Sequence, residues 1–244
     1  MKKKFSVKRI FIICVLLIIL VPVCVVGYYL LPGGKIENVP DGIVKGDNEQ
    51  SRSLIVYFSG DKVTDTSRGL DAVSSASMTV REQEPVGETT IAAQLIQEVT
   101  GADLYQIYTQ RYYPSSYFGT AMKALFEEVI HARPEIANPL GNLDDYDIIY
   151  VGYPIWWMDA PMVIYTFFES NDLSGKTIIP FCTSVDSSIA SGMEDIKRAC
   201  KDAVVLQGIT ANHLSEKDVE DWLTEIGITG FGETEDGDDG SGQN

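Results

Sequence analysis

Five short apolar segments alternate along the chain with segments whose apolar residues recur at helical spacing. Apolar runs of this length, rich in β-branched and aromatic residues, are typical of strands buried on both faces. The predicted strands are 53–58, 104–108, 147–152, 176–181 and 203–206, and the predicted helices are 89–99, 118–129, 162–168, 193–200 and 216–226. This alternation favours right-handed crossovers, so we expect an α/β fold: a three-layer, doubly wound, five-stranded parallel sheet.

The start of the chain differs sharply from this pattern. Residues 10–31 are 22 consecutive positions without a charge, which as a helix is long enough to cross a hydrocarbon core of roughly 30 Å. Five cations precede this run, and the next one after it is Lys35, which predicts a cytoplasmic N-terminus and an exported domain. The alternative is a cleaved signal peptide and a secreted protein, because a basic start before an apolar run is also its signature.

These observations divide the chain into four parts. We expect a membrane anchor over 1–31, a linker over 32–52, one folded domain over 53–228 and an acidic disordered tail over 229–244. The linker is rich in glycine and polar residues, and the last 13 residues carry five acids and four glycines. Segments of this composition cannot bury a core, so both are expected to be mobile.

The charge balance narrows the range of partners. The formal net charge is −16, and five of the 19 cations lie in the first nine residues, so 14 remain against 35 acids. A domain this acidic is repelled by phosphate backbones, which excludes nucleic acid as an expected partner. Small ligands or basic protein surfaces are expected instead.

Sheets of this class bind ligands at the carboxyl ends of their strands, so the loops that follow the strands matter most. Ser59 follows the first strand, and a connection of 26 residues then leads to Gly87, which opens the next helix. Free N–H groups at a helix start, with nearby hydroxyls, can hold a phosphate. The alternative is that the hydroxyls of Thr89 and Thr90 merely cap the helix.

The loop after the third strand reads GYPIWWMDAP over 152–161. Two prolines and a glycine predict irregular backbone, and clustered aromatic side chains at the ligand-binding edge could stack on a planar ring. Alternatively, Trp156 or Trp157 folds back into the core, and we expect one of the two to do so.

Several stretches make the chain resemble the flavodoxin-like family, in the branch with a long insertion after the first strand. They are YFS, GETTIAAQLIQEVTGADLYQI, YYPSSY at 112–117, ARPEI at 132–136, YDIIYVGYPIWWMDAPMVIYTFFE and LSGKTIIPF. The resemblance covers essentially all of 53–228, and the GYPIWW stretch with its spacing to GKTIIPF is its most specific part.

The resemblance implies a sheet with strand order 2-1-3-4-5 that holds FMN non-covalently. By this analogy, residues at the first helix surround the phosphate, the aromatic loop borders the isoalloxazine ring, and the loop after the fourth strand lies opposite. The implied cofactor-binding residues are Ser59, Gly87, Glu88, Thr89, Thr90, Pro154, Ile155, Trp156, Trp157, Thr183, Ser184, Val185, Asp186 and Ser187.

Two of these positions depart from the family pattern. Glu88 stands where the family usually has asparagine, and its carboxylate would repel a phosphate unless it points away. The loop from Thr183 to Ser188 carries side chains where related sequences have glycines. A carboxylate at Asp186 beside the ring would lower the flavin's potential, whereas steric blockage by the loop would abolish binding.

The leading hypothesis is therefore a membrane-tethered, extracytoplasmic flavodoxin-like protein that passes electrons between redox partner proteins or to a small-molecule acceptor. One alternative is an FMN-dependent NAD(P)H:quinone-type oxidoreductase, and another is an interaction module that has lost the cofactor. No constellation of catalytic acid, base or nucleophile stands out in the sequence, and the isolated His131 and His213 lack the spacing of metal ligands. Cys182 and Cys200 are predicted to be free thiols, because they should lie at opposite ends of their elements.

Overall fold

A computed structural model describes residues 34–37, 39–40, 42–47, 52–60, 78–81, 84–114 and 116–229. The predicted membrane segment at 10–31 and the part of the acidic tail beyond residue 229 lie outside these residues. Within the described part of the chain, no helix has both the length and the hydropathy that a membrane span requires.

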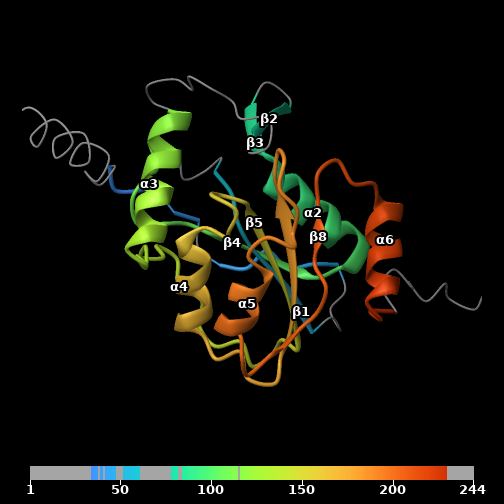
Figure 1. The fold of residues 1–244 in the computed structure, drawn as a ribbon. Helices are drawn as coiled ribbons and strands as arrows, with labels where there is room; N and C mark the ends of the chain where they lie inside the picture. The colour runs from blue at the N-terminus through green and yellow to red at the C-terminus, as the bar shows by residue number, and fades with distance from the viewer. Residues whose placement is uncertain are drawn as a thin grey trace, which may run out of the picture.

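The core of the molecule is a parallel sheet between two layers of helices (Figure 1). Its strands are β1 (Ser53–Phe58), β4 (Asp103–Ile107), β5 (Ile148–Pro154), β6 (Thr177–Thr183), β7 (Val204–Val205) and β8 (Ile209–Thr210). The helices are α2 (Glu88–Thr100), α3 (Tyr117–Val129), α4 (Met162–Ser170), α5 (Met193–Ala199) and α6 (Glu216–Glu225). Helices α3, α4 and α5 lie on one side of the sheet, and α2 and α6 on the other.

The strand order confirms the parallel α/β class and corrects its details. The path runs β4-β1-β5-β6-β7, with every pair parallel, and β8 also pairs with β6. The predicted fifth strand at 203–206 is thus replaced by two short strands, β7 and β8. Gly208 lies between them, where an added Cβ would come within 2.4 Å of the Pro180 carbonyl oxygen. The close approach to β6 at this point leaves no room for a side chain.

The long connection after β1 contains structure that its sequence did not predict. Strands β2 (Met78–Arg81) and β3 (Glu84–Gly87) form an antiparallel hairpin, and β3 runs directly into α2. In Figure 1 this hairpin lies at the end of the sheet where α2 begins. It therefore joins the structure around the predicted phosphate-binding residues.

Burial on both faces explains why the strands are almost wholly apolar. Every residue of β1 is buried, and its side chains alternate between two hydrophobic clusters, one under α4 and α5 and one under α2 and α6. On the second side, α2 presents Ala92, Ala93 and Ile96 to the sheet, while Trp222 of α6 packs edge-on against Tyr150. Cys182 and Cys200 are both buried free thiols, and burial raises the pKa of each to about 12.

Part of the segment predicted as a linker over 32–52 packs against the domain. These residues, at 34–37, 39–40 and 42–47, form an N-terminal strap along the outer edge of β4. Val44 and Leu104 exchange two backbone hydrogen bonds of 2.8 Å, and Ile36 donates its N–H to the Gln110 carbonyl at 3.1 Å. Because Ile36 is also buried, at 7% exposure, the strap has an apolar anchor as well as polar ones.

Asp103 fastens the strap where it passes the start of β4. Its carboxylate accepts hydrogen bonds from Lys45 Nζ at 2.6 Å, the Gly46 N–H at 3.0 Å and the Tyr146 hydroxyl at 2.7 Å. Burial by itself would raise the pKa of Asp103, but these three donors outweigh burial and hold it below its ordinary value. The charged form of Asp103 is therefore the one that the fold stabilises.

Candidate cofactor site at the carboxyl ends of the strands

The predicted phosphate-binding residues lie where β1 ends and α2 begins. Ser59 is completely buried, and its hydroxyl has no hydrogen-bond partner among the residues that the structure describes. The N-cap residue of α2, Gly87, has extended backbone and no side-chain cap, so the first turn of the helix offers N–H groups toward this region. A buried hydroxyl beside an uncapped helix start has unused capacity to donate hydrogen bonds to an anion.

A contact between hydroxyl groups joins this region to the end of β6. Thr89 Oγ1 lies 2.8 Å from Thr183 Oγ1, and both side chains are buried. The two residues are 94 positions apart in the chain. The structure thus brings together the first and third loops that the sequence pointed to, and we call Ser59, Gly87, Thr89, Thr90 and Thr183 the phosphate end of the site.

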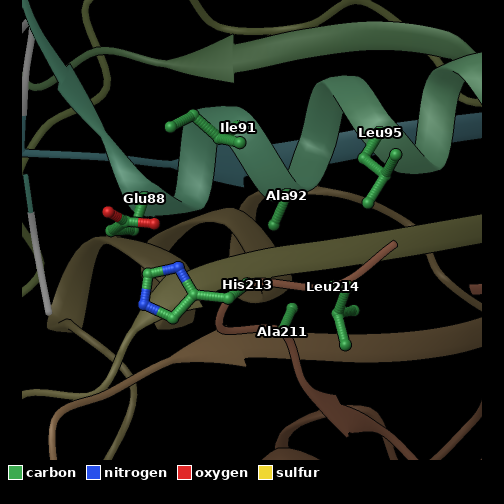
Figure 2. Close-up of a pocket in the computed structure, with 7 residues that line it drawn as sticks. All are labelled: Glu88, Ile91, Ala92, Leu95, Ala211, His213 and Leu214. Atoms are coloured by element: carbon green, nitrogen blue, oxygen red, sulfur yellow. The ribbon is translucent and has the colours of Figure 1, made fainter. Parts of the chain in front are cut away.

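Glu88 does not share this environment, although it lies in the same turn of α2. Its side chain, at 6% exposure, lines a pocket of about 150 Å³. Figure 2 shows its carboxylate beside the His213 ring at one end of the pocket, with the apolar side chains of Ile91, Leu95 and Leu214 further along. The carboxylate is thus turned toward the α6 side of the molecule, which removes the main objection to an anion at the helix start.

The two tryptophans of the aromatic loop have different environments. The half-buried Trp156 packs edge-on against Phe58, with ring centroids 5.5 Å apart, and against Tyr113, at 5.1 Å. This confirms that one tryptophan folds back onto the core. Trp157 is 48% exposed, and its indole Nε1 donates a hydrogen bond of 2.6 Å to the Ala121 carbonyl of α3.

A tight turn holds Trp157 at the surface of the protein. The backbones of Trp156 and Asp159 exchange hydrogen bonds of 2.9 and 3.1 Å around Trp157 and Met158. Both central residues have left-handed backbone, with φ of 53° and 70°, a conformation that glycine adopts far more easily. Asp159 secures the turn, because its Oδ1 accepts hydrogen bonds from the Ala160 N–H and the Tyr165 hydroxyl, both at 2.7 Å. Non-glycine residues held this way are concentrated at functional sites.

The loop after β6 lies beside this turn. Pro154 pairs with Thr183, and the Ile155 N–H donates to the Thr183 carbonyl at 2.8 Å. Further along, Val185 is 68% exposed and Asp186 is exposed as well, so neither side chain fills the interior of the site. We call the residues 154–159 and 184–188 the ring end of the site.

Two residues that hold this loop were missed by sequence reasoning. Asn212 Oδ1 accepts the Ser184 N–H at 2.9 Å, and Thr210 Oγ1 accepts the Ile189 N–H at 2.9 Å. Both belong to the segment at and after β8, a strand too short to show a pattern. An asparagine just after the short segment Ile209–Ala211 was the available signal, because such side chains often satisfy loop backbone.

A buried ionic cluster holds Tyr113, the residue that packs edge-on against Trp156. The Tyr113 hydroxyl donates to Glu127 Oε2 at 2.7 Å, and Lys123 Nζ lies 3.8 Å from Glu127 Oε1 and 4.0 Å from the Tyr113 ring centroid. Burial raises the pKa of Glu127 and lowers the pKa of Lys123.

No group of three or more histidine, cysteine or acidic residues among the described positions is arranged to hold a metal ion.

The residues present fit FMN. The orphaned Ser59 hydroxyl and the uncapped start of α2 would hold a phosphate by donating hydrogen bonds, and the exposed indole of Trp157 offers a flat apolar surface to a planar ring. The part of the insertion at 61–77 lies outside the described residues. Of the predicted residues, Trp156 serves the core, and Glu88 lies in the neighbouring pocket.

Comparison with known proteins shows which family the chain resembles. A family model described as flavodoxin matches residues 78–226. A putative flavoprotein from Bacteroides eggerthii DSM 20697 is 30% identical, with 73% of this chain and 99% of that chain covered and a TM-score of 0.60. For one from Bacteroides uniformis ATCC 8492 the identity is 29%, the coverage 71% and 98%, and the TM-score 0.56.

A more distant structure extends the likeness in fold. The flavoprotein from Lactobacillus acidophilus NCFM, solved in complex with FMN, is 17% identical, with 70% of this chain and 98% of that chain covered and a TM-score of 0.50. No curated protein sequence matches the chain. The family match covers more than half of the chain, and together with the strand order and the site it shows that the protein belongs to the flavodoxin family.

Proposed function

We propose that the protein binds FMN non-covalently and transfers electrons between redox partners while tethered to the outer face of a membrane. The observation that carries the FMN part of the proposal is the Ser59 hydroxyl near the uncapped start of α2. It is buried, and no described residue is its hydrogen-bond partner. A buried polar group left unpaired costs roughly 1–3 kcal/mol, so its retention is best explained by a partner that binds there.

Different residues of the chain would bind the phosphate and the ring of FMN. At the phosphate end, the Ser59 hydroxyl and the α2 N–H groups would hold the phosphate, and the Thr89–Thr183 contact keeps the two loops at a fixed separation. At the ring end, Trp157 would cover one face of the ring and exclude water. FMN, when bound, supplies the capacity to accept and release electrons, and the protein tunes its potential. The FMN bound to the Lactobacillus acidophilus flavoprotein supports this choice of cofactor.

The membrane part of the proposal comes from the uncharged run at 10–31 and the cations that precede it. Anchoring by this segment would leave the acidic domain outside the cytoplasm, where basic surfaces of redox proteins would be attracted to it. A small-molecule electron acceptor is the other partner that the proposal includes.

FMN titration of the purified full-length chain, with riboflavin in parallel, tests the cofactor directly. We expect quenching of flavin fluorescence with FMN and much weaker binding of riboflavin, because riboflavin lacks the phosphate. Equal binding of the two flavins would remove the role given to Ser59, and binding of neither would support a module without cofactor. If the FMN-loaded protein turned over NADH or NADPH with a quinone and no partner protein, the oxidoreductase would replace the electron carrier.

A further inference from the structure

The N-terminal strap fixes the point at which the chain leaves the domain. The strap runs antiparallel to β4 and its extension: Val44 pairs with Leu104 near the start of the strand, and Lys35 pairs with Arg111 beyond its end. The Gly34 carbonyl accepts the Tyr112 N–H at 3.0 Å. Because β4 ends at Ile107, Gly34 lies beyond the carboxyl end of the sheet, which is the end that holds the candidate site.

Direct contacts connect this exit point to the ring end. Tyr113, the neighbour of Tyr112, packs against Trp156 with ring centroids 5.1 Å apart. From the other side, Lys123 of α3 donates to the Tyr112 carbonyl at 3.3 Å, and Ala121 of the same helix accepts the Trp157 indole N–H. The strap, the start of α3 and the ring end therefore form one continuous packed region.

Very little chain separates this region from the predicted membrane segment. That segment ends at residue 31, so three Cα steps lead to Gly34, and an extended chain covers at most about 11 Å in three steps. The buried side chain of Ile36 and the hydrogen bonds of the strap prevent the domain from swinging away on a longer tether.

We propose that the ring end of the candidate site faces the membrane in which the chain is anchored, so that the lipid headgroups of that membrane cover it. The inference rests on the membrane anchoring proposed above, and it adds the orientation of the site to it. A site at the level of the lipid headgroups would exchange electrons with groups at the bilayer surface.

The exposed side chains at the ring end are of kinds that are favourable among lipid headgroups. Trp157, Met158 and Val185 are exposed by 48%, 66% and 68%, and large apolar and aromatic side chains are favourable at the interface between lipid and water. Lys35 and Arg111 are also exposed at this end, in a chain whose net charge is −16. Cations near the anchor are attracted to lipid phosphates, whereas the acidic bulk of the domain is repelled by them.

Site-specific fluorescence quenching in vesicles tests this orientation. Full-length protein would be reconstituted in vesicles of phosphatidylcholine and phosphatidylglycerol that contain a lipid with a nitroxide headgroup. A fluorophore would be attached to Met158→Cys or Val185→Cys at the ring end, or to Val204→Cys, which is 57% exposed at the opposite end of the sheet. Cys14 and Cys24 would be replaced by alanine, and the buried Cys182 and Cys200, with thiol pKa values of about 12, react slowly.

We expect several-fold stronger quenching at both ring-end positions than at Val204→Cys. A flexible insertion between residues 33 and 34 should remove the difference while the protein remains bound to the vesicles. Equal quenching at the two ends in vesicle-bound protein would overturn the orientation and leave the anchor intact. Protein that fails to float with the vesicles would overturn the anchor, and the orientation with it. FMN titration of the unlabelled protein in the same vesicles reports on the cofactor separately.

Discussion

The two ends of the candidate site are built in opposite ways. At the phosphate end, Ser59, Thr89 and Thr183 are almost completely buried and belong to or directly follow regular elements. At the ring end, Trp157 and Met158 are exposed and lie in left-handed backbone. One end is thus a preformed part of the core, and the other is a displayed surface held from outside by hydrogen bonds to α3 and α4.

Within the loop after β5, one residue is therefore expected to contribute to stability and its neighbour to FMN binding. Trp156 packs on the core, while its neighbour Trp157 touches the body of the protein through an indole hydrogen bond to α3. Substitutions at adjacent positions should therefore change different properties, and buried and displayed residues of the site can be tested one by one.

The largest effect is expected from the two tryptophans compared with each other. Trp156→Ala should lower the free energy of unfolding by about 3 kcal/mol, because it leaves a cavity between Phe58 and Tyr113. Trp157→Ala should cost about 1 kcal/mol, the value of one hydrogen bond, yet should weaken FMN binding. Urea unfolding and FMN titration of both variants measure the two properties. Equal losses of stability would contradict the division of roles within the loop.

At the phosphate end the expected changes in stability and binding have opposite directions. Ser59→Ala removes an unpaired buried hydroxyl, so the FMN-free protein should be unchanged or more stable, whereas FMN affinity should fall about tenfold to a hundredfold. Riboflavin affinity should be unchanged. Thermal unfolding without FMN and fluorescence titration with each flavin provide the measurements.

Ser215→Ala is the matched control for Ser59→Ala. Ser215 caps α6 in a capping box with Asp218, so its loss should destabilise the protein by about 1 kcal/mol and leave FMN affinity intact. A loss of FMN affinity in the control, or a clear destabilisation by Ser59→Ala, would show that the Ser59 hydroxyl is structural.

Sequence patterns predicted the regular elements well because burial on two faces leaves a local signal. Strand β1 was predicted at its observed bounds, and the main helices to within a few residues. The strap was missed because its pairing partner, Leu104, lies 60 positions further along the chain, and composition alone favoured disorder. The division of the fifth strand into β7 and β8 depends in the same way on pairing with β6, which lies earlier in the chain.

For the site, the residue types were informative and the geometry was not. Ser59 and the threonines of α2 were identified from their position after a strand and at a helix start. The absence of a partner for Ser59 within the described part of the chain, and the turn of Glu88 toward His213, depend on neighbours supplied by other elements. Which tryptophan enters the core also depends on the left-handed turn at Trp157 and Met158, whose sequence contains no glycine to indicate it.

The strap gives a pH-dependent prediction for the outer edge of β4, near the start of the strand. The pKa of Asp103 is lowered in the folded protein, so its contribution is fully present above its ordinary value of 3.8 and is lost as the pH falls through the lowered pKa. Acidification, or Asp103→Asn at neutral pH, should raise the exchange of the Val44 and Leu104 amides about tenfold after correction for intrinsic rates. The Leu206 amide, which bonds to Ile178 at the opposite edge, is the internal control. Equal acceleration at both edges would indicate global unfolding instead of release of the strap.

The smallest effect tests the strain in the displayed turn. Met158 has a φ of 70°, a conformation that costs a non-glycine residue about 1–2 kcal/mol, while glycine loses about 0.5–1 kcal/mol more conformational entropy on folding. Met158→Gly should therefore stabilise the FMN-free protein by about 0.5 kcal/mol. Val185→Gly, in the neighbouring loop and equally exposed, relieves no such strain and should destabilise it by about 0.5 kcal/mol. Urea unfolding of both variants measures the two signs. If Met158→Gly is destabilising as well, the left-handed turn is relaxed and the ring end stores no strain.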